Sequence, residues 1–519
     1  MLFQILSHAG LLVSGSGINL VCDPWLVGSA YWRSWWNYPP VPRWLVESLK
    51  PDFIYLTHIH WDHFQGPSLR RFSRDTPVLV PKGGCTRMSR DLRQLGFLNI
   101  IEMWHGETIQ LAPNFSLTTY HFSPFTDSAA MLQCEGYTLF NVNDAKFMGG
   151  PLEQILKRHP KVDFVFRSHS SANARLCQEF IDAPSSPADD GSRYARDFAD
   201  FALKVGARYA IPFASNHCYL HKEVFHLNPS IVTPSLVQEH FQGRGILKPE
   251  LKIMVSGDLW CSQSGFAIAE SPYLRERERC LEAYRCEKAS ALEAHYAREA
   301  RASVSLMQMQ RYFEDFFRAL PYLIRRIYKG KPVTYILTGS EITCFIVDLH
   351  LGMVAKVPTP EGSKHPLHVH TSAYIVRHCL SLKMMHLMGI SKRLRFRSRR
   401  ADAKYLLLLE MIYTAYENDL FPLKRLISLR FLGIWLPRWR EILLYARILV
   451  RLGLGQRFLM GDYLRVPPKG SQPSALHHGL LAPGIPKAGS GDGQGAQAPD
   501  PTPILSPFGR KSGAGGAIP

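Results

Sequence analysis

Three histidines and one aspartate fall within residues 58–63, in the stretch Thr-His-Ile-His-Trp-Asp-His that begins at Thr57. An apolar run precedes them, as a buried strand does where it emerges at an active-site edge. In an extended segment His58 and His60 project to the same face, so both imidazoles can bind one ion. Asp62 and His63 lie in the following turn and can serve a second ion, roughly 3.5–4 Å from the first. We favour this interpretation over a chance cluster of solvated histidines.

The elements that position this cluster are short strands alternating with helices over the first 260 residues. Strand candidates alternate apolar and polar residues or form short apolar runs between turn signals. They are ILSHAGLLVSG, INLVCDPWL, DFIYLTHIH, TPVLVPKG, SLTTYHFS, MLQCEGYTLFNVND, VDFVFRSHS and ARYAIPFAS. The segment GPSLRRFSRD is predicted to be helical. The pattern predicts an α/β fold with a mixed sheet.

The motif H-x-H-x-D-H at the end of a strand resembles the signature of the metallo-β-lactamase superfamily. That resemblance implies an αββα sandwich over residues 1–265 with a dinuclear metal site. The implied ligands are His58, His60 and His121 for the first ion, Asp62, His63 and a late histidine for the second, and Asp144 as a bridge. Asp62 and Asp144 would be the catalytic carboxylates, with a hydroxide between the ions as nucleophile. Zinc is the expected metal, although His and Asp ligands suit iron as well.

Several residues near this set have less certain roles under the same resemblance. The late ligand is His221 or His217, and the spacing from Pro-Phe-Ala favours His221. Asp23, in a D-P pair, would accept a hydrogen bond from a ligand imidazole and so fix it. His8 and His169 are expected around the ligands rather than among them, with a purely structural role left open for His169.

Three stretches, 22–36, 140–144 and 212–221, resemble the cytidine-monophosphate N-acetylneuraminate hydroxylases and their bacterial relatives. That family also carries a Rieske iron–sulfur centre, which needs C-x-H and C-x-x-H pairs. This sequence has no C-x-H, and its one C-x-x-H, Cys218 to His221, overlaps the expected metal site. Oxygenation by the family's route would therefore need electrons from a redox partner.

An aromatic stretch follows the D-P pair and includes four tryptophans between residues 25 and 36. It could wall a substrate pocket or touch lipid, and a buried aromatic plug is the alternative. We name Arg33, Trp35 and Trp36 as candidate substrate-binding residues, because Arg33 could grip a carboxylate or phosphate.

The second half of the sequence is basic. The formal net charge is +18, yet residues 1–250 hold 23 basic and 22 acidic residues. Residues 272–465 are predicted to form a mostly helical domain with a small sheet, and the Pro/Gly-rich residues 466–519 a disordered tail. Basic amphipathic helices near residues 423–453 could lie on an anionic membrane surface, with a packed helical domain as the alternative. No motif for sequence-specific nucleic-acid binding is present.

Composition and length exclude several classes of protein. The sequence has no run of 18 or more uncharged apolar residues, and we find no secretory leader. The ten cysteines form no C-x-x-C pair. We therefore expect a cytoplasmic protein, with peripheral membrane association through its basic half as an alternative. The predicted function is metal-dependent hydrolysis of a phosphoester, ester or amide in an anionic sugar-nucleotide or lipid-linked substrate. The alternatives are a di-iron monooxygenase and a membrane-surface binding protein with a structural metal.

Overall fold

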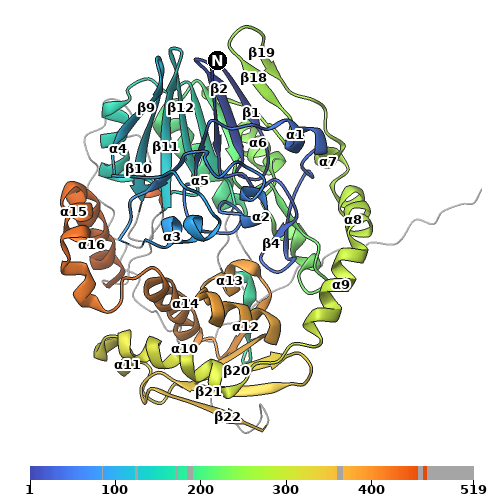
Figure 1. Ribbon diagram of the computed structural model, residues 1–519, viewed down its shortest axis with the longest axis vertical. Coiled ribbons are helices and arrows are strands. Elements are labelled where there is room, and N and C mark those ends of the chain that lie inside the picture. Colours follow the sequence, from blue (N-terminus) through green and yellow to red (C-terminus); the bar gives the residue numbers. More distant parts are fainter. Residues whose placement is uncertain are drawn as a thin grey trace, which may run out of the picture. The chain divides into compact units, whose positions relative to one another are not determined.

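Two β-sheets lie face to face in the computed structural model, and all their strands come from the first 267 residues (Figure 1). The structure describes residues 1–84, 86–122, 127–170, 174–183, 191–358, 366–453 and 460–464. The predicted disordered tail, residues 466–519, lies outside them.

The first sheet has eight strands in the order β19-β18-β1-β2-β3-β6-β7-β8. Their bounds are β1 Leu2–Ile5, β2 Leu11–Gly15, β3 Ile18–Cys22, β6 Phe53–Tyr55, β7 Val78–Pro81, β8 Ile100–Met103, β18 Leu259–Cys261 and β19 Gly265–Ala267. Strands β3, β6, β7 and β8 run parallel to one another. Their carboxyl ends therefore share one edge of the sheet, where binding residues tend to gather.

The second sheet has seven strands in the order β17-β15-β13-β12-β11-β10-β9. Their bounds are β9 Thr108–Ala112, β10 Phe115–Phe122, β11 Asp127–Cys134, β12 Tyr137–Asn143, β13 Phe164–Ser168, β15 Tyr209–Phe213 and β17 Glu250–Leu251. Alternate residues of β10 face opposite sides, so Leu117 enters the core between the sheets while Tyr120 faces the helices outside.

Helices cover the outer faces of both sheets. The helices α1 (Arg43–Ser48), α2 (Gly66–Leu69) and α3 (Arg87–Gln94) pack on the first sheet. The helices α4 (Gly149–Arg158), α5 (Gly191–Val205) and α6 (Pro234–Gly243) pack on the second. These four layers confirm the expected αββα sandwich.

The remaining strands form two smaller sheets. The six-stranded sheet has the order β14-β24-β23-β20-β21-β22, with bounds β14 Gln178–Phe180, β20 Val333–Thr338, β21 Thr343–Asp348, β22 Met353–Val357, β23 His368–Ser372 and β24 Leu394–Ser398. The three-stranded sheet joins β16 (His217–Tyr219), β5 (Trp35–Asn37) and β4 (Ser29–Ala30).

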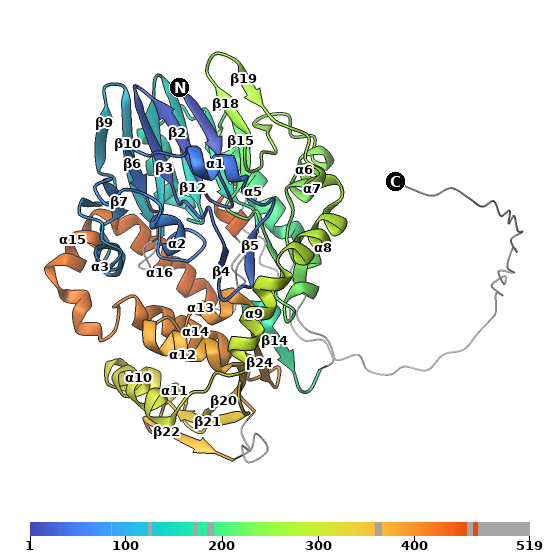
Figure 2. The same cartoon turned by 45° about the vertical axis from the view of Figure 1, so that its right-hand side comes forward.

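Most helices after residue 270 surround these sheets. Their bounds are α7 Pro272–Arg275, α8 Arg277–Glu287, α9 Ala289–Glu299, α10 Leu306–Ala319, α11 Tyr322–Ile327, α12 Ala373–Leu382, α13 Leu387–Ser391, α14 Ala403–Glu417, α15 Leu429–Trp435 and α16 Trp439–Gly453. In both views α8 and α9 lie beside β4 and β5 (Figure 2), where Trp36, Tyr284 and Leu292 share one hydrophobic cluster. No described helix is long and apolar enough to cross a membrane.

The predicted division near residues 265–272 stays a prediction. Residues 1–466 form one compact unit, and two features tie its halves together. Strand β14, from the first half, pairs in parallel with β24 of the second. A single hydrophobic cluster includes Leu56 and Leu337. The basic half is therefore packed continuously with the sandwich.

Candidate metal centre

The residues of the 58–63 loop lie where parallel strands end. Strand β6 stops at Tyr55, so the loop leaves the sheet at its carboxyl edge. Asp23 follows β3 at the same edge, and Asp144 follows β12 of the facing sheet. His8 comes from the turn after β1. Four separate loops therefore bring imidazoles and carboxylates to one end of the sandwich.

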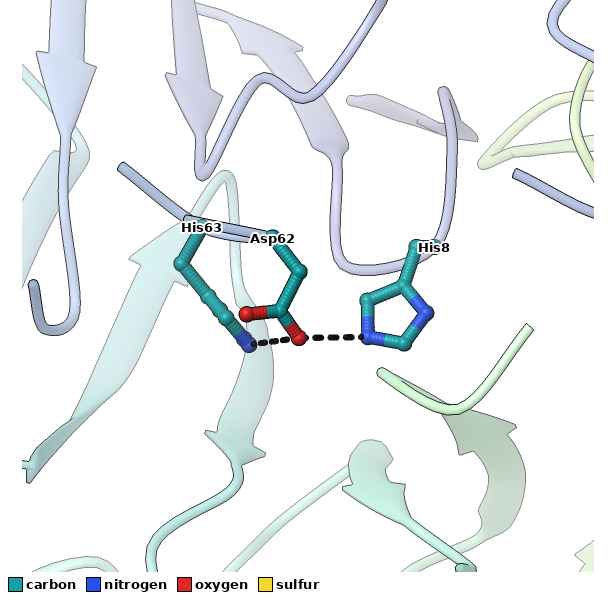
Figure 3. Close-up of side chains that lie close together, drawn as sticks. All are labelled: His8, Asp62 and His63. Atoms are coloured by element: carbon teal, nitrogen blue, oxygen red, sulfur yellow. Dashed lines mark ion pairs between the residues drawn. The ribbon is translucent and has the colours of Figure 1, made fainter. Parts of the chain in front are cut away.

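Two overlapping sets of side chains can each hold a metal ion, and His63 belongs to both. In the first, Asp62 Oδ2 lies 3.2 Å from His8 Nε2 and 3.5 Å from His63 Nε2 (Figure 3). In the second, Asp144 Oδ2 lies 3.3 Å from His63 Nε2 and 4.0 Å from His58 Nε2. His60 adjoins this set, because its Nδ1 is 2.9 Å from His58 Nε2. The arrangement suits two neighbouring ions.

Asp23 orients the shared histidine. The carboxylate is fully buried and accepts hydrogen bonds from the Thr57 backbone N–H (2.8 Å), the Thr57 hydroxyl (2.6 Å) and the Asn143 amide (2.5 Å). Its Oδ2 is also 3.0 Å from His63 Nδ1. A proton held on Nδ1 leaves the Nε2 lone pair free to bind a metal, which is the role predicted for Asp23.

The charges of the centre are strongly coupled. Burial opposes ionisation of Asp62, yet His63 and His8 lower its pKa well below the usual value. Burial likewise opposes the charged form of His63, but Asp62 and Asp23 raise its pKa. Burial and the neighbouring His63 lower the pKa of His58, so it is neutral near pH 7. Anionic carboxylates beside a neutral imidazole form a donor set suited to divalent cations.

His217 and His221, the two candidates for the late ligand, have different surroundings. His217 lies on β16 with its ring 5.4 Å from the His8 ring. His221 lies beyond the strand, where its Nε2 is 3.4 Å from Glu299. The pairing of β16 thus carries His217 towards the centre, and the choice of late ligand stays a prediction.

His221, His295 and Glu299 form a third set with ligand-like spacing. However, Arg393 donates to both carboxylate oxygens of Glu299, at 2.7 and 2.8 Å. A guanidinium in this position repels a cation and already satisfies the carboxylate. We therefore regard this set as a buried polar network.

His121 does not join the ligand sets as the resemblance implies. It lies on the inner face of β10, but its Nε2 is 3.0 Å from the Met103 carbonyl oxygen and its backbone N–H donates to His105. The ring is thus turned towards the end of β8. A proton on Nε2 leaves the lone pair on Nδ1, and His121 is in none of the ligand sets found among the described residues.

Asp127 is a candidate ligand that the sequence did not single out. It begins β11, beside the strand that leads to Asp144. Burial and then the charge of Asp144 raise its pKa to about 7. Asp127 belongs to neither ligand set, but a cation bound near Asp144 would favour its ionised form. The sequence signal that could have indicated Asp127 is its position at the start of the strand that precedes β12.

His8 lies closer to the ligands than expected. It was predicted outside the ligand set, but its Nε2 faces Asp62 directly. His169 is buried, with burial and then His8 lowering its pKa to about 3. The two roles left open for His169 stay predictions.

A cavity of about 710 Å³ adjoins the metal centre. Ile59 and Trp61 of the 58–63 loop form part of its wall. The wall of the cavity also includes Tyr31, Trp32, Arg33, His295, Arg298 and Tyr374. Burial lowers the pKa of Arg33, and the charge of Arg298 lowers it further. Arg70, Arg87 and Asp91 also line the cavity, and the excess of positive charge makes it suitable for an anion.

Trp35 and Trp36 are not among the residues that line this cavity. Trp35 stacks on His217, with ring centroids 3.8 Å apart and planes 4° apart. Trp36 faces the opposite side of β5 and packs against Tyr284 of α8. Both are buried, because alternation along β5 sends one to the metal centre and the other to a helical cluster. Of the three predicted substrate-binding residues, only Arg33 lines the cavity.

The turn before β5 holds three successive residues in the left-handed region. Tyr31, Trp32 and Arg33 have φ values of 50°, 54° and 65°. Non-glycine residues adopt such values at a cost of about 1–3 kcal/mol each, and surrounding contacts must hold them there. Here the turn brings the Tyr31 hydroxyl to within 2.5 Å of Asp62 Oδ1, to which it donates. The strained turn therefore links the cavity to the metal centre.

Comparisons with known proteins find partial similarities in sequence and in structure. No protein-family model matches the chain. The chain is 28% identical over 234 residues to a Mycobacterium tuberculosis protein named "Putative Rieske 2Fe-2S iron-sulfur protein", covering 43% of this chain and 45% of that one. It is 27% identical over 146 residues to the cytidine monophosphate-N-acetylneuraminic acid hydroxylase of Cricetulus griseus, covering 27% and 26%. The matches thus span less than half the length of these relatives.

Among solved structures, a "possible metal-dependent hydrolase" from Veillonella parvula is similar with a TM-score of 0.37 and 12% identity. The similarity covers 50% of this chain and 98% of that one. In sequence, the chain is thus similar to the mycobacterial protein and to the hydroxylase over the residues that match.

Proposed function

We propose that the protein is an enzyme that holds two divalent metal ions and hydrolyses a phosphoester, ester or amide in an anionic substrate. The observation that carries this proposal is the position of His63, whose Nε2 faces both Asp62 and Asp144. One imidazole between two carboxylates, each with its own further histidine, makes two adjacent sites rather than one. Structural sites seldom have this form, because one four-coordinate ion suffices for stability.

The chain's own residues would prepare the reaction in three ways. When bound, two divalent cations polarise a substrate and lower the pKa of water. Tyr31 donates to Asp62 Oδ1 and so leaves Oδ2 directed at His8 and His63. Arg33 and Arg298 would hold the anionic part of the substrate in the adjoining cavity. Sugar-nucleotide and lipid-linked molecules carry a negative charge and are large enough to fill this cavity.

A second candidate is oxygenation of an amino-sugar nucleotide by a di-iron centre, with electrons delivered by a redox partner. The names of the sequence relatives, Rieske iron–sulfur proteins and hydroxylases, favour it. Histidine and carboxylate ligands suit iron as well as zinc.

Metal analysis and turnover assays separate the two candidates. We expect about two zinc ions per chain as isolated, and zinc-dependent turnover in a screen of phosphoester, ester and amide substrates. Two irons with reductant-dependent oxygen consumption would instead establish the second candidate. A chain that takes up no metal after reconstitution would contradict both.

The anion site gives an independent prediction. Replacing Arg298 by glutamine should weaken competitive inhibition by inorganic phosphate about tenfold, because one charge-assisted hydrogen bond is lost. The metal content should not change, since Arg298 lies outside both ligand sets. The matched control is Arg301→Gln, an exposed position just beyond the same helix. Equal inhibition of both variants would place the anion elsewhere.

A further inference from the structure

The segment from Leu423 to Gly453 has an unusual surface for a packed helical region. It comprises a short 3-10 turn, α15, a second 3-10 turn and α16. Nine of its large apolar side chains are exposed, including Leu429 at 89% and Ile427 at 75%. The others are Leu423, Leu432, Leu436, Trp439, Ile442, Leu443 and Val450. Monomeric proteins rarely expose so many apolar side chains in one place.

This segment is nevertheless anchored by its opposite face. The Phe431 ring packs so closely on Gly84 that a Cβ there would collide with it. Arg430 donates to the Gly83 carbonyl oxygen at 2.8 Å. On α16, Leu444 joins the hydrophobic cluster formed by α4 and α5. Both views show α15 and α16 beside the sandwich (Figures 1 and 2). The exposed apolar side chains are therefore held outward by a fixed scaffold.

Helix α16 is apolar on two faces. Its inner face carries Leu444 and Ile448, and its outer face carries Trp439, Ile442, Leu443 and Val450. The outer residues recur at intervals of three, four and seven, which defines one stripe along a helix. A helix that only covered the sandwich would need the inner face alone.

The charge of the segment is almost entirely positive. Residues 423–453 contain seven Lys or Arg residues and a single acidic residue, Glu441. Glu441 is buried and paired with Arg438, whose Nη2 lies 2.6 Å from its carboxylate. Lys424, Arg440 and Arg447 are exposed among the apolar residues, with the Arg440 guanidinium 5.3 Å from the Trp439 ring centre. Exposed leucines and a tryptophan surrounded by cations match an anionic lipid surface.

We propose that residues 423–450 form a docking surface for an anionic lipid bilayer, which they enter from one side without spanning it. The apolar stripe would lie among the acyl chains while Lys424, Arg440 and Arg447 contact lipid phosphates. The surface is joined to the sandwich, since Tyr445 of α16 contacts Phe122 at the end of β10.

Vesicle sedimentation of the full-length protein tests this proposal. The wild type should sediment at low salt with vesicles in which about one third of the phosphatidylcholine is replaced by phosphatidylserine, and less at high salt. Leu429→Glu and Ile442→Glu should each lower the partition coefficient at least about tenfold. Each substitution removes one apolar side chain that would be buried in the bilayer. The matched control, Leu247→Glu, alters a side chain that is 84% exposed elsewhere and should sediment like the wild type.

Further measurements keep the outcome unambiguous. Thermal melting of each variant should match that of the wild type, because the altered side chains are exposed. Leu429→Ser, without added charge, should lower sedimentation as well. A wild type that stays in the supernatant at low salt would overturn the proposal. So would self-association that Leu429→Glu and Ile442→Glu abolish in the absence of vesicle binding, which would assign the face to a second copy of the chain.

Discussion

Replacing His63 by alanine is expected to empty the metal centre. The His63 Nε2 lies 3.3 Å from Asp144 and 3.5 Å from Asp62, so its removal takes one ligand from each set. The remaining carboxylates would face each other with less positive charge between them. Metal content should fall from about two ions per chain to one or none, and turnover by about a thousandfold or more. Elemental analysis after dialysis measures the first effect.

The control for this substitution is His226→Ala, which removes an exposed histidine outside the ligand sets. It should leave metal content and turnover unchanged. Circular dichroism should show that the His63 variant retains its secondary structure, because the two sheets meet in a separate apolar core. Two ions retained in the His63→Ala protein would contradict the proposed ligand sets.

Much of the sandwich could be predicted because its signals are local. Alternation in SLTTYHFS and the apolar run in DFIYLTHIH predict strands, and both form. The residues of the 58–63 cluster lie within one loop, so they stay close together whatever the path of that loop. Asp23 and Asp144 follow strands directly, and the carboxyl edges of these strands meet.

The choice between His217 and His221 and the position of Asp127 could not be predicted, because both depend on contacts between distant segments. His217 approaches His8 only because β16 pairs with β5, a strand about 180 residues earlier in a turn-rich stretch. Asp127 comes near Asp144 through the pairing of β11 with β12. The spacing of residues along the sequence does not show which strands pair. It therefore could not decide between His217 and His221 as the late ligand, and it could not indicate Asp127.

The cavity also depends on both halves of the chain. Arg33 and Trp61 come from the sandwich, whereas Arg298 comes from α9 and Tyr374 from α12. Arg393, on the turn before β24, donates to the Trp32 carbonyl oxygen at 2.9 Å and to Glu299 at the end of α9. Its guanidinium therefore connects the strained turn, α9 and the six-stranded sheet. A side chain with these contacts should govern stability more than any other charge in the described residues.

Replacing Arg393 by methionine is expected to destabilise the protein by about 3–5 kcal/mol, because it leaves the Glu299 charge buried without its partner. Arg393 is fully buried and donates bidentately to Glu299, while its Nε and Nη2 both lie 3.0 Å from Glu223. Burial opposes ionisation of Glu299, but His221, His295 and Arg393 together lower its pKa. A carboxylate with a lowered pKa stabilises the fold above its unfolded pKa of about 4.3 and loses this contribution as the pH falls. Urea unfolding near pH 7 measures the difference.

The matched control is Arg43→Met, which breaks an exposed pair with Glu47 on α1 and should cost less than about 1 kcal/mol. The double variant Arg393→Met with Glu299→Leu removes the unpaired charge as well as its partner. It should recover part of the lost stability, because the cost of a broken buried pair arises mainly from the charge left behind. If Arg393→Met and Arg43→Met were equally stable, the guanidinium would contribute no more than a surface pair. The two halves would then be held together by apolar packing and by the pairing of β14 with β24.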